Sequence, residues 1–476
     1  MPRWTLIFTT LITAHCLGTL SAISQDVNSP IDGESLYLQY CAACHGRNLE
    51  GVNASELIKD DWKYGPSPNH MYRVIMYGIP GTDMAAWSVA LSPEQGRAVR
   101  DYILEKQTVA PSNQREIQDR FERAEGSLKI ENLTPDGDID TPWSIEFVDE
   151  RRLLVSERPG SLRWIIDGKL QNEAIQGTPD PLVYQTSGYM DLAVDPNYEE
   201  NGWIYLAYSH GLEAHDHRNV AGMTKIVRAR IENNRWIQEQ TLFEAKPEDY
   251  VAKGGRWGCR LLIDRDGYLY FSIGDMGRND DVQRLSKPVG KWFRIHTDGS
   301  IPQDNPFVDT PGALPQIFTI GNRNGQGIAQ HPKTGDLWVT DHGPMGGDEL
   351  NLLVKGANYG WPLASYGIDY SGEIVTDRTE VEGTVQPIAY WTPSPALAAA
   401  EFYEGDLFSA WDGSLLVTAL AFEEIKRLQI EDHRVVSGEI ILKNMGRVRD
   451  VKVAPDGSLY AVLNRPDAII RLTPLD

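Results

Sequence analysis

Basic residues are in short supply in this sequence of 476 residues: 45 Lys and Arg stand against 67 Asp and Glu, a formal net charge of −22. Binding to nucleic acid or to anionic lipid needs a basic surface, so this deficit argues against both kinds of partner. It suits a solvated acidic surface, with a basic redox partner as the alternative. The length favours two or three domains over a single core.

Long apolar runs are also missing, with one exception near the start. Residues 4–20 are mostly apolar, follow Arg3, and lead to the small-residue pattern Ala22-Ile23-Ser24. This pattern is typical of a signal peptide, which we assign to residues 1–24. The run is too short to span a membrane comfortably, and no other long one follows. The sequence therefore predicts an exported, periplasmic protein with no transmembrane segment.

Cysteine is scarce as well, with four residues in the whole chain. Cys16 lies in the predicted signal peptide, and Cys41 and Cys44 share a motif of their own. Cys259 is left without a partner, so we predict no structural disulfide.

The motif Cys41-Ala42-Ala43-Cys44-His45 is the attachment pattern of c-type haem. The thiols of Cys41 and Cys44 are expected to form thioethers with the haem vinyl groups, and His45 to bind the iron from one face. A thioredoxin-like dithiol and half of a zinc site are the alternatives. The first lacks a βαβ context and the second lacks another Cys pair.

The second axial ligand of the iron is expected downstream. Met71 and Met76 lie in a stretch with helical periodicity, which favours a place in the core. Met84 lies in a Gly/Pro loop, residues 78–87, that is similar to the methionine loop of small class I cytochromes c, with Ala85 where a proline usually follows. We therefore assign Met84 to the iron. Residues 32–108 are predicted to form a small, mostly α cytochrome c domain, with a capping box at Ser92 opening its last helix, and residues 109–126 a linker.

The rest of the chain, residues 127–476, repeats one pattern six times: a strand, a turn rich in Asp, Gly or Asn, and a second strand of aromatic and β-branched residues. The copies begin near Ser144, Asp191, Leu261, Gly327, Glu401 and Val451. One copy per roughly 58 residues suits a four-stranded propeller blade. The fold class is therefore multidomain, a mostly α cytochrome c domain followed by an all-β six-bladed propeller. A β-sandwich of duplicated hairpins is the alternative.

Three segments of this second domain resemble the glucose/sorbosone dehydrogenase family. They are Gly321-Asn322-Arg323-Asn324-Gly325-Gln326-Gly327, residues 341–352 (DHGPMGGDELNL) and Gly356-Ala357-Asn358-Tyr359-Gly360-Trp361-Pro362. Shorter matches are Gly290-Lys291, residues 301–307 and residues 446–450. The resemblance implies a soluble sugar dehydrogenase that uses pyrroloquinoline quinone (PQQ) and calcium.

The resemblance also implies roles for single residues. Those that match the lining of the PQQ pocket are Arg323, Asn324, Arg447 and Arg449. PQQ carries three carboxylates, which guanidinium groups recognise in a planar, bidentate way. The carbonyls of Gly343 and Pro344 match ligands of the calcium next to the quinone, and Glu349 with the carbonyl of Tyr359 matches a second calcium site. Ion pairs that stabilise the blades are the alternative for the arginines, and a surface salt bridge is the alternative for Glu349.

The sequence departs from the family pattern at the catalytic base. Arg256 stands where the family has the histidine that takes the proton of the sugar's anomeric hydroxyl, so we place Arg256 and Arg323 in the catalytic group. A guanidinium stays protonated and is a poor base. Ala421 stands where the family has a lysine, and the family's pocket glutamine does not align cleanly near Gln185. Histidines that would replace the base are His210, His215, His217 and His342.

These features together predict a quinohaemoprotein dehydrogenase. It would oxidise a sugar or a sugar-like alcohol or aldehyde with PQQ, pass the electrons to its own haem c, and hand them to a downstream cytochrome or oxidase. Fusion keeps the haem at high effective concentration near the quinone. The alternatives are a catalytically altered binding or redox-sensing propeller, and a calcium-dependent hydrolase or lactonase, which leaves the haem unexplained.

Overall fold

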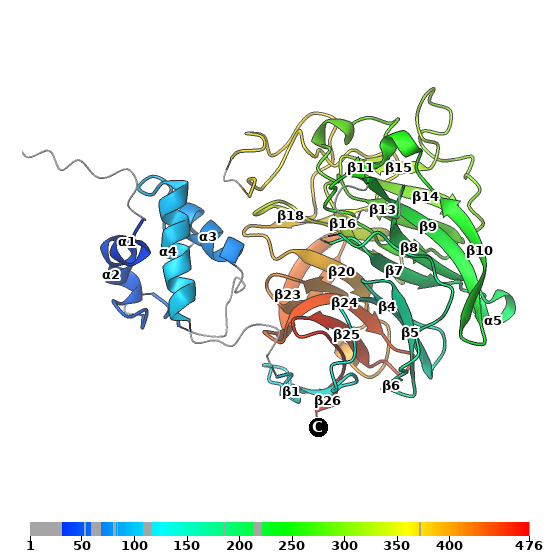
Figure 1. Cartoon of the computed structure of the whole chain (residues 1–476), viewed down its shortest axis with the longest axis horizontal. Helices are drawn as coiled ribbons and strands as arrows, with labels where there is room; N and C mark the ends of the chain where they lie inside the picture. Colours follow the sequence, from blue (N-terminus) through cyan, green and yellow to red (C-terminus); the bar gives the residue numbers. More distant parts are fainter. Residues whose placement is uncertain are drawn as a thin grey trace, which may run out of the picture.

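The structure is a computed structural model that describes residues 31–51, 54–58, 68–79, 82, 84–107, 116–184, 186–212, 221–370 and 373–475. The predicted signal peptide lies outside these residues, as do Gln185, His215 and His217. A small helical domain stands beside a large β-domain (Figure 1). Among the helices described, none has the length and apolar character needed to cross a membrane.

The helical domain contains α1 (Gly33–Tyr40), α2 (Ala42–His45), α3 (Pro68–Tyr77) and α4 (Pro93–Lys106). Helix α4 opens with the capping box expected from the sequence, in which Ser92 and Gln95 bond each other's backbone N–H groups. Helices α1 and α3 both pack on α4. Met71 and Met76 are buried in the resulting core, as their helical spacing predicts. The prediction of a small, mostly α domain is confirmed.

The β-domain is a ring of six antiparallel sheets. Blades one to three are β3 (Pro142–Phe147), β4 (Arg152–Glu157), β5 (Ser161–Ile166) and β6 (Lys169–Leu170); β7 (Tyr189–Val194), β8 (Ile204–Gly211), β9 (Ala221–Glu232) and β10 (Arg235–Phe243); and β12 (Leu261–Ile263), β13 (Tyr268–Ile273), β14 (Lys291–His296) and β15 (Ile317–Ile320). Blades four to six are β16 (Gly325–Gln330), β17 (Leu337–Asp341), β18 (Asp348–Leu352) and β19 (Ala389–Trp391); β20 (Leu397–Phe402), β21 (Leu415–Ala419), β22 (Glu424–Glu431) and β23 (Arg434–Lys443); and β24 (Arg447–Val453), β25 (Leu459–Asn464) and β26 (Ala468–Leu475). Each predicted repeat forms the first two strands of one blade, so the six-bladed propeller is confirmed.

The ring is closed by the start of the β-domain. Strand β2 (Ser127–Asn132) pairs with β26, Ser127 opposite Leu475, and β1 (Arg120–Phe121) pairs with β2. The sixth sheet therefore combines strands from both ends of the β-domain, which removes the open edges that a linear array of blades would expose. Strand β1 falls within the predicted linker, residues 109–126. The minor elements are β11 (Val251–Ala252), α5 (Tyr198–Asn201), η2 (Pro247–Asp249), η3 (Asn279–Asp281) and η4 (Ser409–Trp411).

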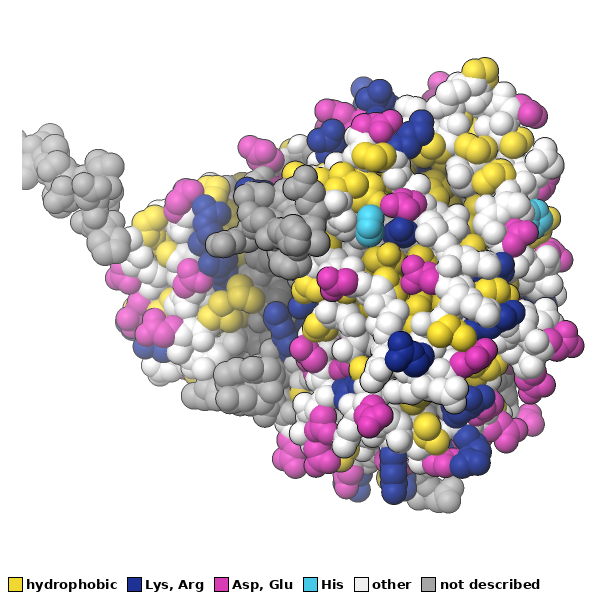
Figure 2. Space-filling model, turned by 45° about the vertical axis from the view of Figure 1, so that its right-hand side comes forward, with side chains coloured by type: hydrophobic (Ala, Val, Ile, Leu, Met, Phe, Trp, Pro, Cys, Tyr) yellow, Lys and Arg dark blue, Asp and Glu magenta, His cyan; other side chains and the backbone are white. Residues whose placement is uncertain are grey.

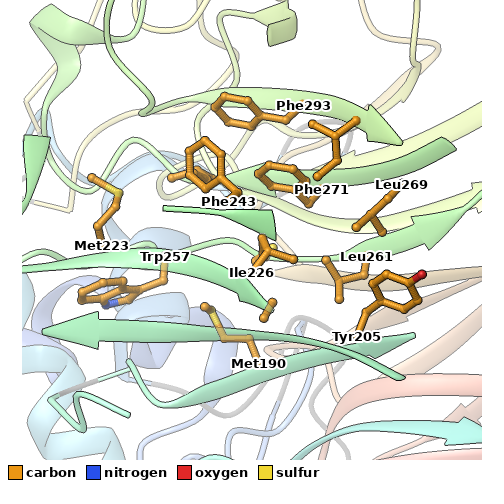
Figure 3. Close-up of a cluster of buried hydrophobic side chains, with 14 of the residues drawn as sticks. Met190, Tyr205, Met223, Ile226, Phe243, Trp257, Leu261, Leu269, Phe271 and Phe293 are labelled. Atoms are coloured by element: carbon orange, nitrogen blue, oxygen red, sulfur yellow. The ribbon is translucent and has the colours of Figure 1, made fainter. Parts of the chain in front are cut away.

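Large apolar side chains fill the space between neighbouring blades. Figure 3 shows this packing between blades two and three, where Phe243 meets a parallel pair formed by Phe271 and Phe293. The rings of that pair are 4.9 Å apart and tilted by 8°. Trp257 is buried in the same cluster. Because Trp257 is anchored there, its neighbour Arg256 is held at a defined place.

The first strand of each blade lies innermost and contacts the first strands of the adjacent blades around the ring. Arg323 and Asn324 come just before β16, and Arg447 opens β24. Arg256 lies a few residues before β12. Since equivalent strand ends meet at one mouth of a propeller, the fold brings these residues to the same face. Figure 2 shows acidic and basic side chains interspersed over one side of the molecule.

Candidate active site

The loop that carries Arg323 and Asn324 is held by one buried carboxylate. The backbone N–H groups of both residues donate to Asp341, and the N–H of Arg323 lies 2.9 Å from Oδ2. The Oδ1 of Asn324 accepts from the N–H of Gly258 at 3.0 Å, which ties blade four to blade three. These bonds fix the direction in which both side chains leave the loop.

The side chain of Arg323 lies across the mouth. Its Nη1 donates to the carbonyl oxygens of His342 at 2.9 Å and Gly343 at 2.7 Å. Its guanidinium also lies 5.4 Å from the centre of the Trp361 ring. A Cβ at Gly343 would come within 2.1 Å of the carbonyl oxygen of Gly346, so this tight loop requires glycine.

Three N–H donors converge here without a hydrogen-bond partner among the described residues: Arg323 Nε, Arg449 Nε and His342 Nε2. His342 Nδ1 lies 3.3 Å from the amide nitrogen of Asn324, so Nδ1 accepts and the ring proton sits on Nε2. Burial and the nearby charges of Arg323 and Arg449 lower the pKa of His342 to about 3. Unpaired buried donors are rare in proteins and point to a ligand that accepts hydrogen bonds.

Positive charge is concentrated at the same place. Burial and the neighbouring guanidinium groups of Arg447, Arg260 and Arg158 lower the pKa of Arg449 to about 9. Burial also lowers the pKa of Arg447. Arg449 stacks on Trp143 at 5.3 Å and reaches Gln326 Oε1 at 3.5 Å. Like charges held together at a mouth destabilise one another until an anion joins them, so the cluster fits a ligand with several carboxylates.

Arg256, which takes the place of the family's base, is paired with a buried acid. Its Nε donates to Oδ1 of Asp275 at 2.6 Å, and Asp275 is fully buried while the Arg256 side chain is 32% exposed. Oδ2 of Asp275 accepts from the indole N–H of Trp361 at 2.9 Å. The backbone of Arg256 adopts a φ of 57°, an uncommon conformation for a residue with a side chain. The arginine is thus a partly exposed cation that Asp275 holds in place through Nε.

A small cavity of about 20 Å³ lies beside this mouth. Its lining includes Arg323, Gly343, Glu349 and Tyr359, which the sequence assigned to cofactor and calcium binding. That volume accommodates a single water molecule or ion. Burial, then the nearby Asp341 carboxylate, raises the pKa of Glu349 to about 8. A cation in the cavity would stabilise the ionised carboxylates.

The predicted ligands of the two calcium sites make different contacts in the structure. The carbonyl of Gly343 is engaged by Arg323, so a cation there would require that guanidinium to move. The carboxylate of Glu349 accepts from the Nδ2 of Asn351 at 3.0 Å, and the backbone N–H of Tyr359 donates to Ile320. Within the described part of the chain, no three or more His, Cys, Asp or Glu side chains cluster as metal ligands. Any ion here would depend on carbonyl oxygens, as the sequence assignments of Gly343, Pro344 and Tyr359 already assume.

In the helical domain, Cys41 is buried at the N-cap of α2 and Cys44 is exposed within that helix. His45 Nδ1 lies 2.8 Å from the carbonyl oxygen of Ser55. That bond places the ring proton on Nδ1 and leaves Nε2 free to bind a metal, the usual arrangement of a ligating histidine. Met84 is half-buried, and its carbonyl accepts from Ile79 N–H at 3.0 Å.

The sequence did not indicate several residues that lie at the mouth. Asp275 lies in the turn Gly274-Asp275-Met276-Gly277 that follows β13, and that position was the only signal for it. Trp143 and Arg158 carry no local signal. Ala421, which stands where the family has a lysine, is buried in a small apolar cluster. His210 bonds the Tyr250 hydroxyl at 2.7 Å, and burial lowers its pKa.

Both domains of the chain match known protein families. Residues 139–471 match the family described as Glucose / Sorbosone dehydrogenase, and residues 28–103 match that described as Cytochrome C oxidase, cbb3-type, subunit III. The aldose sugar dehydrogenase YliI of Escherichia coli (strain K12) is 35% identical over 341 residues, covering 71% of this chain and 91% of that protein. Quinoprotein glucose dehydrogenase B of Acinetobacter calcoaceticus is 27% identical over 409 residues, covering 69% of this chain and 81% of that protein.

The solved structure of the soluble aldose sugar dehydrogenase from Escherichia coli, in its apo-form, has a TM-score of 0.68 and 32% sequence identity, and covers 73% of this chain and 100% of that chain. The match of fold, length and sequence extends over the whole propeller. The chain therefore belongs to the glucose/sorbosone dehydrogenase family of PQQ-dependent sugar oxidoreductases, and it carries a cytochrome c domain of the cbb3 subunit III type ahead of the propeller.

Proposed function

We propose that this protein is an exported quinohaemoprotein that oxidises a sugar or sugar-like alcohol or aldehyde at the propeller mouth and passes the electrons to its own haem c. The observation that carries the proposal is the set of unpaired buried donors, Arg323 Nε, Arg449 Nε and His342 Nε2, within a cluster of arginines. PQQ, when bound, supplies a two-electron acceptor and three carboxylates, and those carboxylates suit these donors.

The side chains of the mouth have distinct tasks in this proposal. Arg323, Arg447 and Arg449 bind and orient the anionic cofactor. Burial and the charges of Arg323 and Arg449 keep His342 neutral, and Asn324 fixes its proton on Nε2. The indole of Trp361 and the ring of Trp143 cover the guanidinium groups of Arg323 and Arg449 and exclude water from them. Glu349 and the carbonyls of Gly343, Pro344 and Tyr359 remain the proposed ligands of calcium, which prefers oxygen.

Replacing Arg449 by alanine should weaken PQQ binding about ten-fold or more. A charge-assisted bond in a shielded pocket is worth roughly 1.5–3 kcal/mol, and every 1.4 kcal/mol is a factor of ten in affinity. Calorimetric titration of PQQ into the haem-loaded protein with calcium measures the change. Arg471→Ala, on β26 of the same blade, is the matched control because Arg471 pairs with the surface residue Asp456. If Arg449→Ala binds PQQ as tightly as the wild type does, Arg449 is not part of the PQQ site. If the wild type binds no PQQ, the proposed function is wrong.

Arg256 is proposed to set which substrates react. A guanidinium cannot accept the proton of a neutral hydroxyl, but it can bind a substrate carboxylate or stabilise a developing alkoxide. His342 does not restore a base, because its Nδ1 is engaged by Asn324 and its pKa is lowered to about 3. We therefore expect weak turnover of neutral aldoses and a preference for acidic sugars.

Changing Arg256 to histidine should raise kcat/KM for glucose at least about ten-fold. Asp275 already stands beside this position and would orient an imidazole as the partner of a general base, a role worth roughly 10²–10⁴ in rate when fully developed. Dye-coupled assays with glucose and glucuronic acid test this. Arg256→Gln, which removes the charge without supplying a base, serves as control and should not gain activity on glucose. A wild type that oxidises glucose rapidly and glucuronic acid slowly contradicts this role of Arg256.

A further inference from the structure

Helix α3 of the helical domain contacts the propeller at the mouth described above. Arg73 of α3 donates from Nε to the carbonyl oxygen of Met345 at 3.0 Å. His70, one turn earlier on α3, bonds through Nε2 to the carbonyl oxygen of Ser394. The His70 ring also meets Phe422 edge-on at 5.6 Å. In Figure 1, α3 lies on the side of the helical domain that faces the propeller.

An apolar side chain of the propeller also packs into the core of the helical domain. Met345 belongs to the propeller, yet it is only 5% exposed and packs in the same cluster as Cys41, Met71 and Met76 of the helical domain. Its own N–H donates to the carbonyl of Ile368 at 2.9 Å. A propeller methionine thus completes the core that surrounds the haem-attachment cysteine.

The burial of Arg73 indicates a specific contact between the two domains. Arg73 is 8% exposed, and its guanidinium lies 5.0 Å from the Tyr77 ring. Burying a charged group is costly unless hydrogen bonds compensate, and the Met345 carbonyl supplies one of them. An arginine that needs a propeller carbonyl is suited to the docked arrangement and poorly suited to a free helical surface.

The carboxylate of Asp348 accepts hydrogen bonds both at the contact with α3 and at the propeller mouth. Asp348 Oδ1 accepts from the backbone N–H of Gly343 at 2.9 Å and from the hydroxyl of Ser394 at 2.5 Å. The two residues whose carbonyls receive α3 therefore lie beside groups that Asp348 holds: Met345 is two positions after Gly343, and Ser394 bonds Asp348 directly. Asp348 therefore connects the residues that contact α3 with the loop at the cofactor mouth.

We propose that the face of α3 formed by His70 and Arg73 is the docking surface through which the haem receives electrons, and that Met345 is the positioning residue that joins the two sites. This inference rests on the proposed function. Oxidation of one sugar hemiacetal to a lactone releases two electrons and two protons. Bound haem iron would accept one electron at a time, from Fe(III) to Fe(II), so an external one-electron acceptor such as ferricyanide would have to reoxidise it before the second transfer. Both protons leave to solvent.

The test compares full-length, haem-loaded protein reconstituted with PQQ and calcium. Arg73→Ala should slow reduction of the haem by substrate, followed by stopped-flow absorbance, by about ten-fold or more, since the docked state loses a charge-assisted bond. Its turnover with a dye that accepts electrons directly from the propeller should be unchanged. Arg97→Ala is the matched control, because Arg97 lies on α4 and pairs with the exposed Glu94.

A second variant and a second readout separate docking from folding. Met345→Ala changes only the propeller side of the contact and should also slow haem reduction, while the spectrum of ascorbate-reduced haem stays normal. Without PQQ, amides of α3 and of residues 343–347 should exchange hydrogen faster in Arg73→Ala than in Arg97→Ala. Unchanged haem reduction in both interface variants, or unchanged exchange, overturns the proposal. If the wild type reduces no dye with any sugar, the proposed function fails, and the exchange experiment still decides whether the docking surface exists.

Discussion

Protein with Cys41 or Cys44 replaced by serine should lose the absorbance bands of covalently bound haem c, and with them all reduction of haem by substrate. The serine hydroxyl cannot form the thioether that each thiol makes with a haem vinyl group. The double variant should retain no haem at all after denaturing extraction, measured by absorption spectroscopy of the reduced protein. This is the largest effect we expect from any single position, because no other residue can supply the bond.

Cys259→Ser provides the matched control. Cys259 is fully buried between propeller blades, far along the chain from the haem motif, and its loss should leave the haem spectrum unchanged. Met84→Ala should retain the haem but lose the methionine–iron charge-transfer band and shift the redox potential, whereas Met76→Leu in the core of α3 should not. Haem that survives extraction from the double cysteine variant would contradict covalent attachment through these thiols.

Replacing Arg260 by alanine should destabilise the propeller by about 3–5 kcal/mol, the usual effect of removing one partner from a buried ion pair. Arg260 is 4% exposed and its Nη1 lies 3.0 Å from both Asp191 of β7 and Asp450 of β24. It also donates to the carbonyl oxygens of Gln326 and Arg449, each at 2.7 Å. Without it, two buried carboxylates from different blades lose the cation between them and keep only their backbone donors, Leu261 N–H for Asp191 and Ile145 N–H for Asp450.

Chemical denaturation followed by far-UV circular dichroism measures this loss. Arg284→Ala is a suitable control, because Arg284 is 59% exposed and pairs with Asp281 on the surface, where ion pairs contribute little. Arg260→Lys should recover part of the stability by keeping the charge, although an ammonium cannot match the planar fork that reaches both carboxylates. A midpoint for Arg260→Ala equal to that of the wild type would show that the blades do not depend on this cation.

The haem motif, the six repeats and the family motifs were readable from the sequence because each is local. A thioether site needs two thiols three residues apart, and a blade begins with two strands joined by a short turn, so spacing alone identifies them. The capping box at Ser92 and the core positions of Met71 and Met76 follow from helical periodicity in the same way. The resemblance to the sugar dehydrogenase family implied that Arg323 and Arg449 line one pocket.

Other features depended on contacts between distant segments, and only the tertiary structure decided them. The pairing of Arg256 with Asp275 orients the guanidinium of Arg256. The contact of Arg323 with Gly343 places a guanidinium where a cation ligand was expected. The bond from Arg73 to Met345 joins residues 272 positions apart. Such contacts are set by the packing of whole domains and blades, which no local spacing encodes. The sequence by itself identified the haem motif, the repeats and the candidate cofactor-binding side chains. The tertiary structure decided which of those side chains contact one another.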